Sequence, residues 1–222
     1  MAQPLIRGFV RDLAVRVELP DPIVELGSLQ VEAEQEGDLR PLFAGRDFTG
    51  CDMRPGPGVD RVEDLRALSF ADQEIGTALC LDTLEHCADP AAAGRELARV
   101  TADGGVCAIS SVLLFGIHGY PDDYFRFTPD GFRALLAGFD DVWVAGIGHP
   151  SNPRQVVGVG AKGRALDLRL DDLPSLADAQ GDFDRAAGRV AVGPFLLGPG
   201  ALARLFAGQG PRVAWQRLRG AR

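Results

Sequence analysis

The chain has 222 residues, of which 46% are hydrophobic, so it is long enough to bury a substantial core in one domain. Its formal net charge of -8 argues against broad binding to nucleic acids. The sequence lacks a long uninterrupted apolar run, and charged residues interrupt its N-terminal apolar stretch. We therefore expect neither a transmembrane helix nor a signal peptide, and a cytoplasmic location.

The first half of the chain alternates between predicted helices and predicted buried strands. Its first helix is indicated by apolar residues at helical spacing and ends at Pro20 and Pro22. A later helix has Pro90 in its first turn, where proline is well tolerated. We expect helices at residues 5–17, 39–43 and 90–100, strands at 22–26, 47–52, 75–81 and 106–112, and a short extended piece at 59–65. Such alternation predicts a parallel α/β sheet.

Two further strands are expected at residues 140–147 and 155–161, joined by the turn residues 148–153. No helix separates them, so they should pair in the antiparallel direction. The sequence thus predicts a doubly wound parallel sheet that is completed by a C-terminal antiparallel hairpin.

The composition changes after Gly163. Residues 164–184 are acidic, whereas every charge after Asp184 is an arginine. We expect one domain over residues 1–163, followed over 164–222 by an acidic linker and a basic helical extension. The basic tail would either touch a membrane surface or pack on the acidic domain or a second subunit. Prolines interrupt any long helix there and favour packing.

Acidic residues lie at or near the ends of three predicted extended segments, at the edge of the sheet where doubly wound folds bind ligands. Gly27 allows a tight turn after the first strand, and Glu25 could accept bonds from an ammonium or hydroxyl group. Asp52 could bind both hydroxyls of a ribose. Asp64 could accept from an exocyclic amine while Leu65 packs on a flat base. Any one acid at a strand end is more often a helix cap or turn former, but the order of all three favours ligand binding.

Six segments together resemble class I S-adenosylmethionine-dependent methyltransferases, and more narrowly the group with a type-11-like methyltransferase domain. They are VELGS, GCDMRPGPGVD, EDL, CLDTLEHCADP, ELARVTADGGVCAISS and HGYPDDYFRFTPDGFRALL. The resemblance covers roughly Pro22 to Gly163. It implies a Rossmann-like, seven-stranded, mostly parallel sheet with helices on both faces, methyltransferase activity, and S-adenosylmethionine as cofactor.

The resemblance also implies which residues bind the cofactor. Glu25 matches the acid near the methionine end, Asp52 the ribose-binding acid, and Asp82 the end of the fourth strand beside the methionine portion. The full set of expected cofactor residues is Glu25, Gly27, Ser28, Asp52, Met53, Asp64, Leu65, Leu81 and Asp82.

The first motif departs from the family pattern, because Leu29 and Val31 stand where the second and third glycines belong. S-adenosylmethionine has no phosphate and so needs no glycine-rich phosphate cradle. The loop Leu29–Gly37 contains three glutamates and no lysine or arginine. This charge argues against NAD or FAD and fits a cationic cofactor.

The resemblance also implies that the segment Phe115–Pro129 lies over the methyl group of the cofactor. Methyl transfer to a hydroxyl needs a nearby acceptor and a base that takes the proton. His118 is the best base by its ordinary pKa, with Asp123 either orienting it or serving as the base itself. Arg126 could hold an acidic acceptor or pair with a neighbouring aspartate, and the whole segment could instead be a structural lid. The candidate catalytic residues are His118, Tyr120, Asp123, Tyr124 and Arg126.

No metal and no disulfide are expected. The adjacent Asp122 and Asp123 are a poor ligand set for magnesium by themselves. The cysteines form no C-x-x-C pair, and three lie in or beside predicted strands, which favours buried free thiols over a zinc site or disulfide framework. They are Cys51, Cys80, Cys87 and Cys107.

The function expected from the sequence is biosynthetic O-methylation of a small-molecule hydroxyl, on a sugar or a secondary metabolite, by an enzyme that binds no nucleic acid and could form a homodimer. One alternative is an enzyme of the same fold that methylates nitrogen, carbon or a carboxylate, or uses S-adenosylmethionine differently. The other is a non-catalytic interaction module. The acids at three strand ends favour an enzyme.

Overall fold

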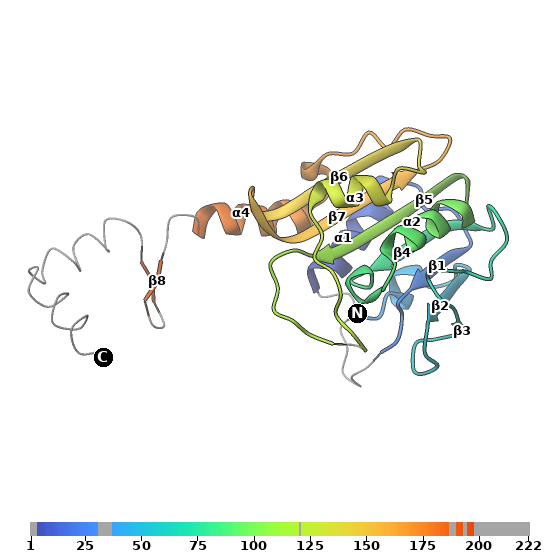
Figure 1. Ribbon diagram of the computed structural model, residues 1–222. Coiled ribbons are helices and arrows are strands. Elements are labelled where there is room, and N and C mark those ends of the chain that lie inside the picture. Colours follow the sequence, from blue (N-terminus) through green and yellow to red (C-terminus); the bar gives the residue numbers. More distant parts are fainter. Residues whose placement is uncertain (1–3, 31–36, 120, 187–189, 193–194, 198–222) are drawn as a thin grey trace, which may run out of the picture. The chain divides into compact units, whose positions relative to one another are not determined.

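The computed structural model describes residues 4–30, 37–119, 121–186, 190–192 and 195–197 (Figure 1). The chain divides into two compact units, Met1–Gly181 and Asp182–Arg222, and each is described by itself. The strands are β1 (Ile23–Leu26), β2 (Phe48–Asp52), β3 (Arg61–Val62), β4 (Ile75–Leu81), β5 (Thr101–Val112), β6 (Asp141–His149), β7 (Asn152–Ala161), β8 (Val190–Val192) and β9 (Phe195–Leu197). The α-helices are α1 (Pro4–Arg16), α2 (Pro90–Val100), α3 (Pro129–Leu135) and α4 (Pro174–Ala186), and the short 3-10 helices are η1 (Arg40–Phe43), η2 (Leu84–His86) and η3 (Leu170–Asp172).

Seven strands form one sheet in the order β3-β2-β1-β4-β5-β7-β6. The first five strands in this order run parallel, whereas β7 is antiparallel to both β5 and β6. The predicted fold class is therefore confirmed, including the antiparallel hairpin at one edge. Strands β2 and β3 are added on one side of β1, and β4 and β5 on the other, so the strand order switches between β1 and β4. A crevice is expected outside the carboxyl ends of these two strands.

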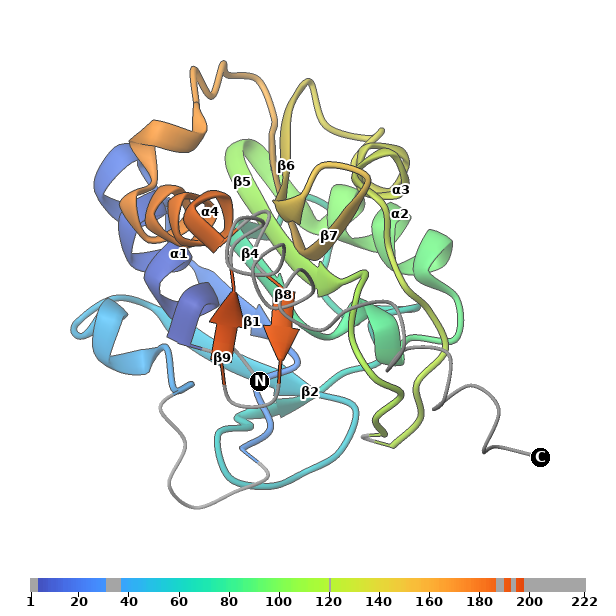
Figure 2. The ribbon, with the colours of Figure 1, turned by 90° about the vertical axis from the view of Figure 1, so that its left-hand side faces the viewer.

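Helices cover both faces of the sheet (Figure 2). Successive side chains of a strand point to opposite faces, so β4 contributes to two cores. Leu79 and Leu81 pack in the core that contains α1 and the start of α4. Ala78 and Cys80 pack in the core that contains α2 and α3. All four cysteines are buried free thiols, as expected.

Capping residues and prolines in the local sequence define where two helices begin. Asp89 caps α2 by accepting a hydrogen bond from the Ala92 backbone N–H at 2.9 Å, and Pro90 occupies the first turn. Thr128 caps α3 in the same way through the N–H of Gly131, at 3.1 Å. The predicted bounds of α2 are confirmed.

Strand β5 begins earlier than predicted, at Thr101 rather than at Val106. Thr101 pairs with Ile75 of β4, and the register then shifts before Val106 pairs with Thr77. Gly104, with a φ of 77°, lies in this irregular stretch. Gly104 and Gly105 therefore lie inside an interrupted strand.

The first compact unit extends to Gly181, past the boundary expected at Gly163. Leu166, Leu173 and Leu176 are buried in the same core as α1. Buried Asp12 of α1 accepts a hydrogen bond from the Ser175 backbone N–H at 2.6 Å. This region therefore contributes apolar side chains to the core of the first unit, although its overall composition is acidic.

The second unit contains an antiparallel pair, β8 and β9, where a helical extension was expected. Most of the arginine-rich tail, residues 198–222, lies outside the described residues, so the expectation of a membrane or subunit contact there stays a prediction. Among the described helices, none is long and apolar enough to cross a membrane.

Candidate active site

A cavity of about 490 Å³ opens at the carboxyl ends of β1, β2, β4 and β5. Its wall includes Gly27 after β1, Asp52 at the end of β2, Asp82 after β4 and Val112 at the end of β5. The position is the one that the sheet topology favours, and the volume is typical of small-molecule sites.

Six of the predicted cofactor residues line this cavity: Gly27, Asp52, Met53, Asp64, Leu65 and Asp82. The other three do not. Glu25 and Ser28 border a much smaller neighbouring cavity. Ser28 donates its hydroxyl to the Gly58 carbonyl at 2.9 Å, which joins the first strand to the turn after β2. Leu81 is buried in the core.

Asp52 lies at the end of β2 with its side chain 14% exposed. One carboxylate oxygen accepts a hydrogen bond from the Arg54 backbone N–H at 3.0 Å. A carboxylate has about four lone-pair directions, so this single bond leaves acceptor capacity for a ligand in the cavity.

Asp64 is tied to Arg66 at the rim of the cavity. The Arg66 guanidinium donates to both carboxylate oxygens, at 2.7 Å and 2.9 Å for the closest contacts, and lowers the pKa of Asp64. A ligand amine must therefore share this carboxylate with Arg66. The neighbouring Glu63, which sequence reasoning missed, also lines the cavity, but Ser69 and Arg61 occupy its carboxylate.

Asp82 is the most constrained acid of the site. It has a positive φ of 47°, a strained conformation of the kind that clusters at functional sites. Its Oδ1 accepts hydrogen bonds from the Ser110 hydroxyl at 2.8 Å and the Gln155 amide at 2.6 Å. Oδ2 is buried and has no hydrogen-bond partner in the described part of the protein. Burial raises the pKa of Asp82, and a cation in the cavity would oppose this shift by favouring the charged carboxylate.

Glu25 is buried behind the cavity, and desolvation raises its pKa to about 8. In the unfolded chain its pKa lies near 4.5, so both states are protonated in acid. Between about pH 4.5 and 8 the unfolded chain releases the proton while the folded protein keeps it, and wild-type stability falls as pH rises.

We expect Glu25→Gln to remove this pH dependence. Relative to wild type, the variant should gain stability from about pH 5 to pH 8, on the order of a few kcal/mol at 1.4 kcal/mol per pKa unit. Urea unfolding at several pH values measures the gain. Glu18→Gln, at an exposed position, is the charge-matched control. A difference between Glu25→Gln and wild type that stays constant with pH would contradict the expectation.

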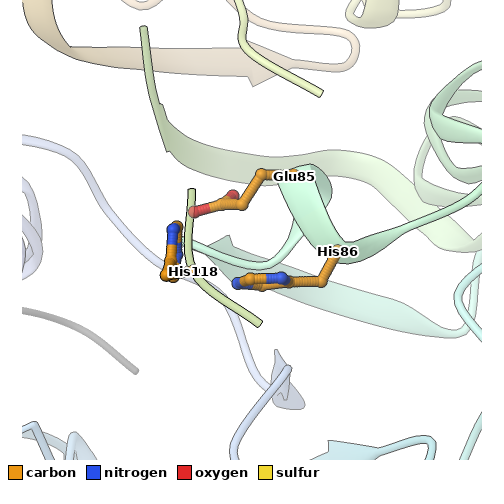
Figure 3. A group of neighbouring side chains, drawn as sticks. All are labelled: Glu85, His86 and His118. Carbon is orange, nitrogen blue, oxygen red and sulfur yellow. The ribbon is translucent and has the colours of Figure 1, made fainter. Parts of the chain in front are cut away.

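On the other side of the cavity, the segment after β5 is tied to η2. Tyr124 donates its backbone N–H to the Glu85 carbonyl at 2.8 Å, and His86 Nδ1 lies 2.5 Å from the Asp122 carbonyl. These contacts bring His118 next to His86, with ring centroids 4.9 Å apart and nearly perpendicular planes. Figure 3 shows both rings beside the carboxylate of Glu85. His86, His118 and Glu85 all line the cavity.

The structure separates the two roles that the sequence left open for Asp123. Its carboxylate pairs with the Arg126 guanidinium at 2.5 Å and accepts from the His118 backbone N–H at 2.8 Å. Arg126 holds the pKa of Asp123 well below its usual range, which makes this carboxylate a poor base. Neither Asp123 nor Arg126 lines the cavity, so the pair supports the segment that carries His118.

The two tyrosines differ. Tyr124 lines the cavity and donates its hydroxyl to the Asp122 carboxylate at 2.9 Å. This bond and its nearby negative charge raise the pKa of the Tyr124 phenol. Tyr120 lies outside the described residues, so its expected role stays a prediction.

Glu85 is the acid that sequence reasoning missed. It is 1% exposed, accepts from the Ser111 hydroxyl at 2.6 Å, and has a pKa raised to about 7 by burial and by Asp82. The sequence signal was the run Leu84-Glu85-His86 directly after a buried strand, which places two adjacent polar groups at the ligand-binding edge of the sheet.

Comparison with known proteins supports the Rossmann-like α/β fold. Residues 42–109 match the model of the methyltransferase domain family. A chain of the complex that holds the Haloferax volcanii Trm112 methyltransferase activator aligns with 15% identity and a TM-score of 0.51, over 71% of this chain and 89% of that one. The CurJ carbon methyltransferase aligns with 11% identity and a TM-score of 0.53, over 71% of this chain and 54% of that one. The search of curated protein sequences found no match.

The sheet order and the cavity define a Rossmann-like domain with a cavity at the carboxyl ends of β1, β2, β4 and β5. Together with the methyltransferase-domain match, they support a class I S-adenosylmethionine-dependent methyltransferase with S-adenosylmethionine as the methyl donor.

The residues of the cavity fit this cofactor. Its wall contains more acids than bases: Asp52, Glu63, Asp64, Asp82, Glu85 and Asp122 against Arg54 and Arg66. A sulfonium cation with an ammonium group is favoured by such a wall. Asp52 has acceptor capacity for ribose hydroxyls. The acidic loop of the sequence falls largely on residues 31–36, which lie outside the described residues.

Proposed function

We propose that this methyltransferase acts on a hydroxyl oxygen of a small molecule. When bound, S-adenosylmethionine supplies a methyl group on a sulfonium sulfur; transfer forms an oxygen–carbon bond, breaks the sulfur–carbon bond and releases the hydroxyl proton. The protein must therefore hold the hydroxyl next to the cofactor and favour the loss of its proton.

The position of His118 carries this proposal. Its Nδ1 faces the Gly116 carbonyl at 3.1 Å and the Asp123 carboxylate at 3.4 Å. Both partners accept hydrogen bonds, so the proton of the neutral ring is assigned to Nδ1 and the lone pair to Nε2. A ring nitrogen with a lone pair, in the wall of the cavity, can act on an acceptor hydroxyl. Asp123 is then a positioning residue for His118.

The surface around the cavity mouth supports an acceptor with an apolar part. Phe115 and Tyr124 line the cavity and are 44% and 50% exposed. Nearby Leu114, Ile117 and Phe125 are also exposed. Water-exposed apolar side chains at the mouth of a small-molecule site favour a ligand that covers them. We therefore favour a secondary metabolite, or a sugar that carries an apolar group.

For the cofactor, we propose that Asp52 binds the ribose hydroxyls, Asp64 and Leu65 the adenine, and Asp82 the methionine ammonium. Glu25 and Ser28 lie behind this surface, and Ser28 acts through the turn that it joins to β1. The catalytic domain in this proposal is the first compact unit, to Gly181.

A second candidate is a methyltransferase that works with a protein partner. The same exposed residues Leu114, Phe115 and Ile117 favour it, because such a surface also suits a protein interface. One structural neighbour was solved together with a methyltransferase activator. An enzyme of this kind could methylate nitrogen or carbon of a larger substrate.

The proposal is tested in two steps. Calorimetric titration of the purified protein with S-adenosylmethionine and with S-adenosylhomocysteine should give micromolar binding of at least one. A screen of hydroxyl acceptors should then find methylation that His118→Ala lowers by about 10²–10⁴-fold. His149→Ala, at the end of β6, is the control and should keep full activity.

Absence of cofactor binding at millimolar concentration would overturn the methyltransferase proposal. Cofactor binding without methylation of any hydroxyl acceptor would overturn the O-methylation proposal and favour the second candidate.

A further inference from the structure

Three side chains from two segments converge in the wall of the cavity. Glu85 and His86 come from η2, and His118 comes from the segment after β5. One ligand atom from each residue lies within 4.8 Å of the other two. Figure 3 shows that the carboxylate and the two imidazole rings face one another.

Each of the three groups has one polar atom occupied by the protein and one left over. His86 Nδ1 faces the Asp122 carbonyl at 2.5 Å, and His118 Nδ1 faces the Gly116 carbonyl at 3.1 Å. A carbonyl can only accept a hydrogen bond, so both Nδ1 atoms are assigned protons. Each Nε2 atom then carries a lone pair that could bind a metal ion. The Ser111 hydroxyl donates to Glu85 Oε2 at 2.6 Å, which leaves Oε1.

This pattern is the one found around protein-bound metal ions. A ligating histidine almost always donates its second ring N–H to a carbonyl or carboxylate, and a ligating carboxylate is itself hydrogen-bonded. Two imidazole nitrogens and one carboxylate oxygen suit zinc and other first-row transition metals, whereas magnesium and calcium prefer ligand sets made of oxygen.

We propose that Glu85, His86 and His118 bind a divalent transition-metal ion that holds the hydroxyl oxygen of the methyl acceptor. Three protein ligands leave a coordination position open, and all three ligands line the cavity. A bound cation lowers the pKa of a coordinated hydroxyl, so the proton is released to water. His118 then acts on the acceptor through the metal.

From the sequence we expected no metal, because Asp122 and Asp123 by themselves are a poor ligand set. The proposed site uses neither carboxylate. Asp123 pairs with Arg126, and Asp122 accepts from the Tyr124 hydroxyl. Both residues instead support the ligands, Asp122 through its carbonyl on His86 and Asp123 through the backbone of His118.

The metal site is tested on the full chain after removal of bound metal by a chelator. Calorimetric titration with Zn²⁺ and with Mn²⁺ should show one site, and Co²⁺ should give the visible absorption of a low-symmetry complex. Glu85→Gln, His86→Ala and His118→Ala should each weaken metal binding at least 10-fold. Thermal unfolding of each variant verifies that it folds.

Two matched variants keep this test specific. His149→Ala removes the remaining histidine, which ends β6, and should leave metal affinity unchanged. Cys87 follows His86 in the sequence, and it also lines the cavity. Cys87→Ser removes its thiol and should also leave the metal affinity unchanged. Absence of binding, or binding that the three ligand variants do not weaken, would overturn the site.

The activating role rests on the proposed function and is tested separately. Methylation of an identified hydroxyl acceptor should fall at least 10-fold in metal-free protein and return when Zn²⁺ or Mn²⁺ is added. Equal rates with and without metal would overturn the role and leave His118 as the direct base. If metal binds at these residues but no hydroxyl acceptor is methylated, the site stands and the O-methylation proposal fails.

Discussion

Replacing Asp52 with alanine should lower the affinity for S-adenosylmethionine by about 100-fold or more. The Asp52 carboxylate ends β2 in the wall of the cavity and has acceptor capacity beyond its bond to the Arg54 N–H. Two hydrogen bonds from ribose hydroxyls to a carboxylate contribute about 1.5–3 kcal/mol each, and 1.4 kcal/mol corresponds to a factor of ten. Calorimetric titration measures the change.

Two control variants separate this loss from effects of charge or folding. Asp52→Asn keeps one acceptor oxygen and should lose less affinity than Asp52→Ala. Asp130→Ala removes one negative charge from the exposed start of α3, away from the cavity, and should bind like wild type. Unchanged affinity in Asp52→Ala would mean that the ribose is bound elsewhere or that the ligand has no ribose.

Replacing Gly27 with alanine should destabilise the protein by about 3 kcal/mol or more and also weaken cofactor binding. Gly27 has a φ of 101°, which costs an alanine about 1–2 kcal/mol. A Cβ at this position would lie 2.0 Å from the Thr83 hydroxyl oxygen, which donates to the Leu81 carbonyl at 2.9 Å. Thr83 must then move, which adds about 1–3 kcal/mol. Urea unfolding measures the stability.

Gly45→Ala isolates the conformational part of this cost. Gly45 has a φ of 80°, and a Cβ there meets no atom within 4 Å. Its substitution should therefore show the backbone strain alone. If Gly27→Ala were no more destabilising than Gly45→Ala, the close approach of the turns after β1 and β4 would not limit the residue at position 27.

The sheet and the position of the cavity could be predicted because their signals are local. Asp89 and Pro90 define the start of α2 within a few residues, and alternating strands and helices fix the parallel order. Asp52 and Asp82 then fall at the ligand-binding edge, since both directly end or follow a buried strand.

What could not be predicted depends on contacts between distant residues. The burial of Glu85 follows from Ser111 on β5, which no local pattern reveals. The early start of β5 depends on the pairing of Thr101 with Ile75. The packing of Leu173 and Leu176 against the core of α1 is likewise invisible in a segment whose composition is acidic.

The chain order of the core also determines when the protein can fold during synthesis. The apolar face of α1, with Ile6, Phe9 and Leu13, shares its core with Val157 of β7 and Leu176 of α4. Residues of β1, β4 and β5 share this core as well, so a nascent chain can cover its first helix only in part until β7 and the start of α4 have been made. Because β7 inserts between β5 and β6, the sheet is also incomplete until then. The partly synthesised chain exposes apolar surface throughout this interval and is a substrate for chaperones.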